Sequence, residues 1–250
     1  MAHIIYALYG FISYALGLAS LVAFMLFANN LFGVALGENY ASLNIDHYNG
    51  PAKPYPVFWN SMLLLVFGLQ HSIMARPWFK HLLTRLMPER LERSTYILAT
   101  AVALLLIVQF WQPVASHTFW TVNDPTARLA INGLYLLGYG ITVAATYMLS
   151  HNHLFGLTQS MGSGDTDKTF RTPLFYKYMR HPIQTGILIA MLATPDMTYG
   201  RAVLAAGMIV YIFIGLYFEE KNLIEEFGDT YRDYKKRVPA LLPFLKVGRF

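Results

Sequence analysis

Residues 172–243 read TPLFYKYMRHPIQTGILIAMLATPDMTYGRAVLAAGMIVYIFIGLYFEEKNLIEEFGDTYRDYKKRVPALLP. A polar, basic entry ends in Arg180-His181-Pro182 and leads into an apolar segment over residues 182–194. Pro195 separates it from a second apolar segment, residues 199–220, which ends in Glu219-Glu220. If both segments are helices, they form a hairpin that returns both ionisable pairs to one membrane surface. The stretch therefore predicts a pocket with a cation, an imidazole and two carboxylates.

The composition of the whole chain indicates the same class of protein. Its 250 residues are 55% hydrophobic and 13% charged, whereas soluble domains carry about 25% charged residues. Apolar runs approach the length of about 20 residues that crosses a bilayer. We therefore expect an all-α, polytopic transmembrane bundle. The chain has no cysteine, which excludes disulfides, thiolate metal sites and cysteine nucleophiles.

The apolar runs predict five to six membrane spans in a single integral membrane domain over residues 1–250. The expected spans are residues 4–27, 56–74, 94–111, 129–150 and 199–220, with the short segment 182–194 between the last two. That segment covers only about 20 Å, against a hydrocarbon core of about 30 Å. Four helices thus belong to residues 1–150, and the hairpin with its tail to residues 151–250.

The basic residues predict the orientation of these spans. Of the 19 Lys and Arg residues, all but Lys53, Arg128 and Arg201 fall in one alternating set of connections. By the positive-inside rule that set faces the cytoplasm. Both termini and the polar rim of the hairpin are therefore expected inside, and the basic character indicates topology rather than a nucleic-acid partner. The connection over residues 29–56 should be external and irregular, with Asp46 and His47 exposed to solvent.

Histidines near the cytoplasmic ends of the spans are further candidates. His71 lies in the last turns of the span 56–74, and an ionisable residue within a span is a functional hypothesis by default. The alternative is a histidine that hydrogen-bonds a neighbouring helix. His151 and His153 are two residues apart, so they diverge on a helix, and we predict no metal site.

The polar rim of the hairpin points to a class of ligand. Arg180 precedes a helix N-terminus, and both attract a carboxylate or phosphate. Glu219 and Glu220 suit a cation or ribose hydroxyls, and aromatic faces for a base or a sulfonium come from the residues Tyr176, Tyr178 and Tyr217. S-adenosyl-L-methionine carries all of these groups. The alternative is an Arg–Glu salt bridge that only closes the hairpin.

A family resemblance strengthens the ligand hypothesis. The last third of the chain resembles the C-terminal pattern of the isoprenylcysteine carboxyl methyltransferase and phospholipid methyltransferase superfamily. The residues that carry it are Arg180-His181-Pro182, Gly186, Pro195, Glu219-Glu220, Leu223, Phe227-Gly228, Tyr231, Tyr234, Val238-Pro239 and Pro243. The resemblance implies that S-adenosyl-L-methionine is held by Tyr178, Arg180, His181, Pro182, Gly186, Tyr217, Glu219 and Glu220. Gln184 stands where that superfamily commonly has an aromatic residue.

The earlier part of the chain resembles a narrower group. The stretches GLQHSIMARPWFK (68–80), ERSTYILAT (92–100) and HNHLFGLTQ (151–159) are similar to NnrU-like membrane proteins. Within that group they resemble the methanethiol S-methyltransferases. The resemblance implies a bacterial inner-membrane enzyme that methylates a small apolar thiol, methanethiol, to dimethyl sulfide. The thiol would arrive through membrane lipid, and His71, His153 and Tyr178 are the candidate catalytic residues.

Three alternatives remain open at this stage. One is a haem-binding NnrU-like isomerase or redox protein that uses His71 with His151 or His153 as axial ligands. Another is a methyltransferase that acts on a lipid or a prenyl-cysteine. The third is a membrane scaffold without catalysis.

Overall fold

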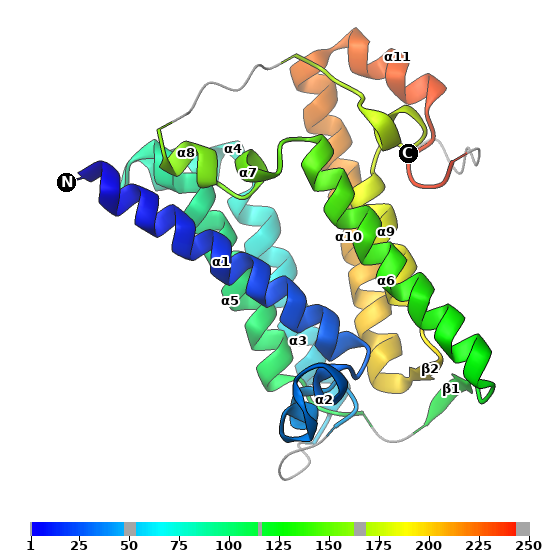
Figure 1. The fold of residues 1–250 in the computed structure, drawn as a ribbon. Helices are drawn as coiled ribbons and strands as arrows, with labels where there is room; N and C mark the ends of the chain where they lie inside the picture. Colours follow the sequence, from blue (N-terminus) through cyan, green and yellow to red (C-terminus); the bar gives the residue numbers. More distant parts are fainter. Residues whose placement is uncertain (1, 48–53, 115–116, 163–168, 244–250) are drawn as a thin grey trace. The chain divides into compact units, whose positions relative to one another are not determined.

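The computed structural model describes residues 2–47, 54–114, 117–162 and 169–243, and within them the fold is mostly helical (Figure 1). The elements are α1 (Ala2–Ala28), α2 (Phe32–Leu36), η1 (Glu38–Leu43), α3 (Pro56–Met74), α4 (Pro77–Thr84), η2 (Glu89–Leu91), α5 (Glu92–Phe110), β1 (Thr118–Thr121), α6 (Pro125–Met148), α7 (His151–Leu154), α8 (Leu157–Ser160), η3 (Leu174–Lys177), α9 (Pro182–Leu192), β2 (Asp196–Thr198), α10 (Tyr199–Phe227) and α11 (Asp229–Arg237).

Among the described residues, five helices are long and apolar enough to cross a membrane: α1, α3, α5, α6 and α10. The chain is therefore an integral membrane protein. The sixth candidate, α9, has 11 residues and covers about 16 Å. The expected spans agree with these helices to within a few residues at most ends, because apolar length alone locates them.

The helix that contains the last predicted span, residues 199–220, continues to Phe227. The residues that follow Glu220 no longer form an apolar run, but Lys, Leu and Glu among them are good helix formers. Gly228 then has φ 55°, a left-handed backbone that glycine adopts easily. The helix therefore ends at the glycine and not where the apolar run ends.

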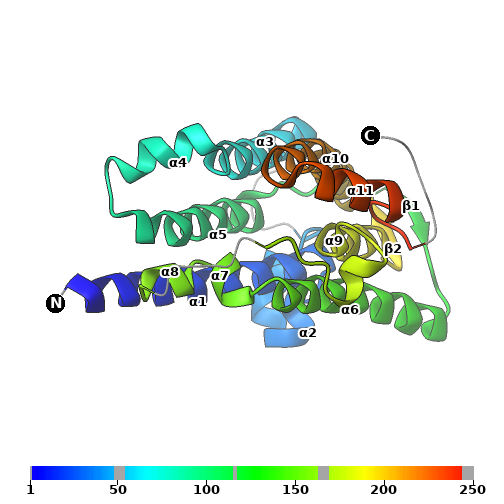
Figure 2. The same cartoon turned by 90° about the horizontal axis from the view of Figure 1, so that it is seen from above.

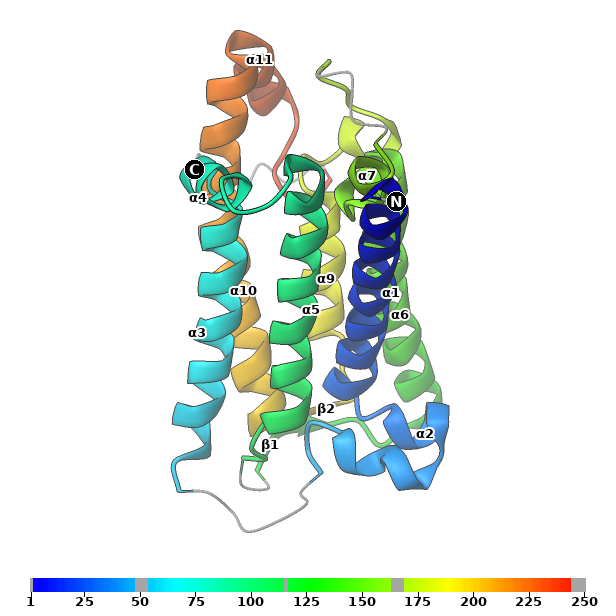
Figure 3. The ribbon, with the colours of Figure 1, turned by 90° about the vertical axis from the view of Figure 1, so that its left-hand side faces the viewer.

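The chain divides into two compact units. The first unit comprises residues 1–121, 152–164 and 196–207, and α5 is its central helix, packed against α1 and α3. Buried apolar residues line α5 along its length, among them Ala101, Leu104, Ile107 and Val108. Figure 3 shows α1, α3 and α5 side by side.

The connection after α1 is more ordered than we expected. It contains α2 and η1, and Ile45 is fully buried, while residues 48–53 lie outside the described part. The Asn44 side chain accepts a hydrogen bond from the Phe32 amide at 3.0 Å. Asp46 accepts from Asn30 at 2.7 Å and from Thr198 at 2.6 Å. The prediction of an irregular connection was wrong, although Asp46 and His47 are exposed as predicted.

The same end of this unit holds a two-stranded antiparallel sheet, in which Thr121 of β1 pairs with Asp196 of β2. The sheet brings the connection that follows α5 together with the residues that precede α10. Arg201 in the first turn of α10 is buried and donates a hydrogen bond to the Ala28 carbonyl at the end of α1. These contacts fix the start of α10 within the unit.

The second unit comprises residues 122–151, 165–195 and 208–250. Its closest helix pair is α6 with α9, which lie side by side in Figures 1 and 2. A methyl group added at Gly186 would clash with the Gly138 carbonyl and lie 2.8 Å from the Thr142 amide nitrogen. Thr142 also donates to the Ile183 carbonyl at 3.1 Å. Small residues thus let the two backbones approach closely, as in many membrane helix pairs.

Gly186→Ala should therefore destabilise the protein by about 1–3 kcal/mol, the usual effect of overpacking. Gly133→Ala on α6 is the matched control, because no atom lies within 4 Å of a methyl group added there. Thermal unfolding in detergent would show the difference. Equal midpoints for the two variants would mean that α9 is not packed against α6 through Gly186.

Candidate active site

The hairpin of α9 and α10 brings together the ionisable pairs predicted from the sequence. Pro182 occupies the first turn of α9, where its missing N–H costs nothing, so Arg180 and His181 stand just before the helix. Glu219 and Glu220 lie late in α10, and both contact His181. The prediction that both pairs meet on one surface is confirmed.

Glu220 is the centre of this cluster and is only 5% exposed. Its Oε1 accepts hydrogen bonds from Arg180 Nε at 2.7 Å and from His181 Nε2 at 3.0 Å. Its Oε2 lies 2.6 Å from Lys235 Nζ of α11. One buried carboxylate therefore contacts three basic side chains from two separate segments of the chain, and the Arg–Glu salt bridge is present.

The backbone of the C-terminal tail covers the start of α9. Four carbonyl groups accept hydrogen bonds from the residues at this helix start: Pro239 from the Arg180 amide, Ala240 from the His181 amide, Val238 from the Arg180 guanidinium and Leu241 from the Thr185 hydroxyl. We expected a carboxylate or phosphate there. In the structure, the chain's own carbonyl oxygens satisfy these donors.

His181 is 2% exposed and lies between the two glutamates. Its Nδ1 is 3.7 Å from Glu219 Oε1. Burial lowers the pKa of His181, but hydrogen bonds to Glu219 and Glu220 and the charges of both carboxylates outweigh burial, so the pKa lies above its ordinary value. The imidazolium form is thus favoured at this position.

The solvent-facing side of the cluster is formed by other residues. The Glu219 side chain is 46% exposed, and Gln184 Nε2 donates to Glu219 Oε2 at 3.0 Å. Tyr178 and Tyr217 are 58% and 60% exposed, so both present an aromatic face. Tyr176 does not, because it is buried and burial raises the pKa of its hydroxyl.

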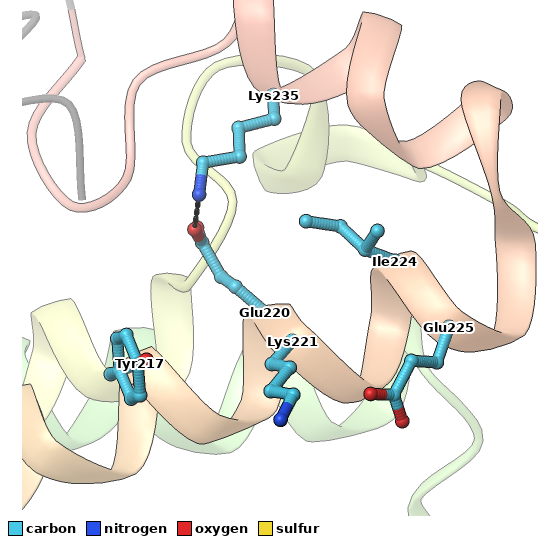
Figure 4. A pocket seen from close by; sticks show the side chains of 6 residues that line it. All are labelled: Tyr217, Glu220, Lys221, Ile224, Glu225 and Lys235. Atoms are coloured by element: carbon cyan, nitrogen blue, oxygen red, sulfur yellow. Dashed lines mark ion pairs between the residues drawn. The ribbon is translucent and has the colours of Figure 1, made fainter.

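A pocket of about 350 Å³ opens beside Glu220 (Figure 4). Its lining residues are Tyr217, Glu220, Lys221, Ile224, Glu225 and Lys235. Five of them recur at helical spacing along one side of α10, and Lys235 reaches toward Glu220 from α11 (Figure 4). The pocket therefore offers both charge signs and one aromatic ring.

Comparison with known proteins adds the family. The chain is 39% identical to methanethiol S-methyltransferase of Mycobacterium tuberculosis over 235 residues, which are 91% of this chain and 94% of that protein. It is 40% identical to methanethiol S-methyltransferase of Pseudomonas deceptionensis over 206 residues, 81% of this chain and 78% of the relative. It is 39% identical to methanethiol S-methyltransferase 2 of Bradyrhizobium diazoefficiens over 247 residues, which are 97% of this chain and 91% of that protein.

The chain belongs to the methanethiol S-methyltransferase family. No family model matches it, and no solved structure does. The predicted resemblance to the methanethiol S-methyltransferases is confirmed, and the aligned length includes both units of the chain.

In this member of the methanethiol S-methyltransferase family, His71 lies in the first unit with both ring nitrogens engaged. Thr100 donates its single hydroxyl hydrogen to the Tyr96 carbonyl at 2.9 Å, so it accepts from His71 Nδ1 at 3.1 Å. The other nitrogen, Nε2, then carries no hydrogen and accepts from the Tyr96 hydroxyl at 2.7 Å. An axial haem ligand at His71 would have to break one of these bonds.

The remaining candidates have different surroundings. His153 is half-buried in α7, and burial, followed by the charge of Arg93, lowers its pKa. His151 is buried against the Tyr147 ring, with ring centroids 4.2 Å apart. Pro182 and Gly186 are buried, and Gly186 contacts α6, which gives it a packing role.

Sequence reasoning gave no place in the cluster to three residues of α11. Tyr231, Tyr234 and Lys235 recur at the spacing of one helix face, but the two tyrosines entered the sequence analysis only as part of the family pattern, and Lys235 only as a basic residue. The Tyr234 hydroxyl donates to the Tyr176 carbonyl. Tyr231 is 1% exposed, and its hydroxyl has no hydrogen-bond partner among the described residues.

Proposed function

We propose that this protein transfers a methyl group from S-adenosyl-L-methionine to methanethiol, giving dimethyl sulfide. The observation that supports this most directly is the buried Arg180–Glu220–Lys235 cluster beside a pocket of mixed charge, in a chain whose relatives are methanethiol S-methyltransferases over most of their length. The charge distribution supports a cytoplasmic site and an inner-membrane location with both termini inside.

The groups around the pocket fit the methyl donor. Its amino-acid part carries an ammonium and a carboxylate, which the acidic and basic lining residues Glu225 and Lys221 would bind. The exposed ring of Tyr217 in the lining suits a sulfonium, and so does the half-exposed carboxylate of Glu219, which is next to Glu220 in the chain but outside the lining. Outside the lining residues, the buried Tyr231 hydroxyl has no hydrogen-bond partner among the described residues, and such groups are rare unless they have a ligand or water partner.

The buried residues of the cluster would act mainly on the site's shape, and of Arg180, His181 and Glu220 it is Glu220 that also lines the pocket. Arg180 and Glu220 are held by each other, and by His181, Lys235 and the tail. Their role would be to position Glu219, which directly precedes Glu220 in α10 and contacts His181. Gln184 fixes the other oxygen of Glu219, so it orients a carboxylate where the superfamily commonly has a ring.

When bound, the donor supplies a methyl group on a positively charged sulfur, and the thiol sulfur accepts that methyl. The contribution of the chain would be orientation of the reactants and removal of the thiol proton, since an ordinary thiol has a pKa of about 8.5. His71, His153 and Tyr178 are the proposed proton acceptors. If His71 is the acceptor, the proton would reach it through the Tyr96 hydroxyl, because that hydroxyl donates to His71 Nε2.

Purified protein incubated with methyl-labelled S-adenosyl-L-methionine and methanethiol would test the proposal. Labelled dimethyl sulfide should accumulate in the headspace. If labelled product forms with a prenyl-cysteine or a phospholipid and none forms with methanethiol, that compound and not methanethiol is the methyl acceptor. A Soret band in protein that binds no S-adenosyl-L-methionine would instead support the haem alternative.

Two tyrosines of α11 provide a matched test of the donor site. Tyr231→Phe should weaken binding of S-adenosyl-L-methionine by about 2- to 13-fold, the effect of one lost hydrogen bond of about 0.5–1.5 kcal/mol, without lowering stability. Tyr234→Phe should lower the unfolding midpoint instead, because it loses the bond to the Tyr176 carbonyl. Calorimetry and thermal unfolding separate the two effects. Unchanged affinity together with a higher midpoint for Tyr231→Phe would mean that the hydroxyl has no ligand.

A further inference from the structure

A short helix in the first unit carries an exposed apolar stripe that the proposed function does not use. α4 has eight residues, and Trp78 and Leu82 are four apart on it, with Leu86 four residues further on. These side chains are 60%, 48% and 80% exposed. Positions four apart share one side of a helix, so Trp78 and Leu82 form an apolar strip on α4. Leu86 is a further exposed apolar side chain, two residues past the end of the helix at Thr84.

The direction of α4 differs from that of the spans beside it. Arg76 has an extended backbone, φ −77° and ψ 141°, and precedes Pro77; a residue before proline is disfavoured in a helix. The chain therefore turns between α3 and α4. In Figure 3, α3 and α5 run vertically, whereas α4, at their upper end, is viewed nearly along its axis. At about 12 Å, α4 is also too short to cross the bilayer.

The charge around α4 has a single sign. Arg76, Lys80 and Arg85 are basic, and the sequence contains no Asp or Glu between Asp46 and Glu89. An in-plane amphipathic helix has this composition, with Trp and Leu toward the acyl chains and Lys or Arg toward the headgroups. Trp is also the residue that anchors the interface between membrane and water.

We propose that α4 lies in the headgroup layer of the cytoplasmic leaflet and binds anionic phospholipids. Trp78, Leu82 and Leu86 enter the boundary with the acyl chains. Arg76, Lys80 and Arg85 contact the lipid phosphates. Basic residues near an anionic surface add to the binding of lipid, so anionic lipid should be preferred over zwitterionic lipid by several-fold or more.

Fluorescence quenching in bilayers tests this surface without any assay of activity. The whole protein is reconstituted with brominated phosphatidylglycerol or with brominated phosphatidylcholine, and the emission lost on Trp78→Phe reports Trp78. That component should be quenched by both lipids, with phosphatidylglycerol effective at a several-fold lower mole fraction. Trp120→Phe is the control, because Trp120 lies on β1, away from this basic stretch, and its component should show no headgroup preference.

The variant K80Q/R85Q should retain quenching of Trp78 and lose most of the headgroup preference. Both side chains are at the surface of α4 or just after it, and a thermal midpoint close to that of the unchanged protein would show that the variant folds. Three results would overturn the proposal: quenching of Trp78 by aqueous iodide but not by brominated lipid, equal quenching by the two lipids, or a preference that survives K80Q/R85Q.

Discussion

Replacing Glu220 with Ala should destabilise the folded protein by about 3–5 kcal/mol, as is usual when one partner of a buried ion pair is removed. Arg180, His181 and Lys235 would then remain close together with no carboxylate at their centre. Methyl transfer should be lost, because the tail and α11 would no longer be held to the hairpin. Thermal unfolding in detergent and binding calorimetry measure the two effects.

The adjacent residue is the control for this experiment. The Glu219 side chain is 46% exposed, so Glu219→Ala should leave the unfolding midpoint nearly unchanged. It should still weaken binding of S-adenosyl-L-methionine, since we propose that this carboxylate meets the donor. If Glu220→Ala unfolds at the same temperature as the unchanged protein, the buried cluster is not what holds the hairpin to α11.

Replacing His71 with Ala should lower kcat by about 100-fold or more, the effect of losing a positioned proton acceptor. Affinity for S-adenosyl-L-methionine should change little, because the donor is proposed to bind in the second unit. Tyr96→Phe should lower kcat similarly, and the double variant should be no worse than either single variant, since the proton path runs through both. Steady-state kinetics and calorimetry provide the measurements.

Normal turnover in His71→Ala would leave His153 and Tyr178 as the candidate proton acceptors. If turnover survives in His71→Ala, the bonds to Tyr96 and Thr100 serve packing alone. His153→Ala and Tyr178→Phe then become the informative variants. The exposure of Tyr178 means that its loss should leave stability unaffected.

The sequence was sufficient for those parts of the fold and site that depend on local chemistry. Apolar length located the spans, and the proline between the two segments predicted the hairpin that pairs Arg180 with Glu220. The charge of Lys235 was visible, but its partner was not, because α11 returns to the hairpin only through the left-handed backbone at Gly228. The residues near such a turn do not predict the direction that the chain takes after it.

Other features depend on contacts between distant segments. Arg180 looked available for an anion, yet its backbone and side chain are satisfied by carbonyls of Val238 and Pro239. The ordered connection after α1 depends on Thr198, 152 residues later in the chain than Asp46. The engaged state of His71 likewise requires knowing that α3 lies against α5.

The close approach of α6 and α9 determines which parts of the second unit are able to move. At Gly138 and Gly186 the backbones of the two helices are in direct contact. Sliding one helix over the other would bring larger side chains into this contact, so we expect the pair to move as a rigid body. α11 is attached differently, through side-chain bonds from Lys235 and Tyr234, a bond from Arg180 to the Lys235 carbonyl, and ring contacts of its tyrosines with Phe170. These contacts are able to break one at a time. Opening for the entry and release of a ligand should therefore occur at α11, and amide hydrogens there should exchange with solvent faster than those of α6 and α9.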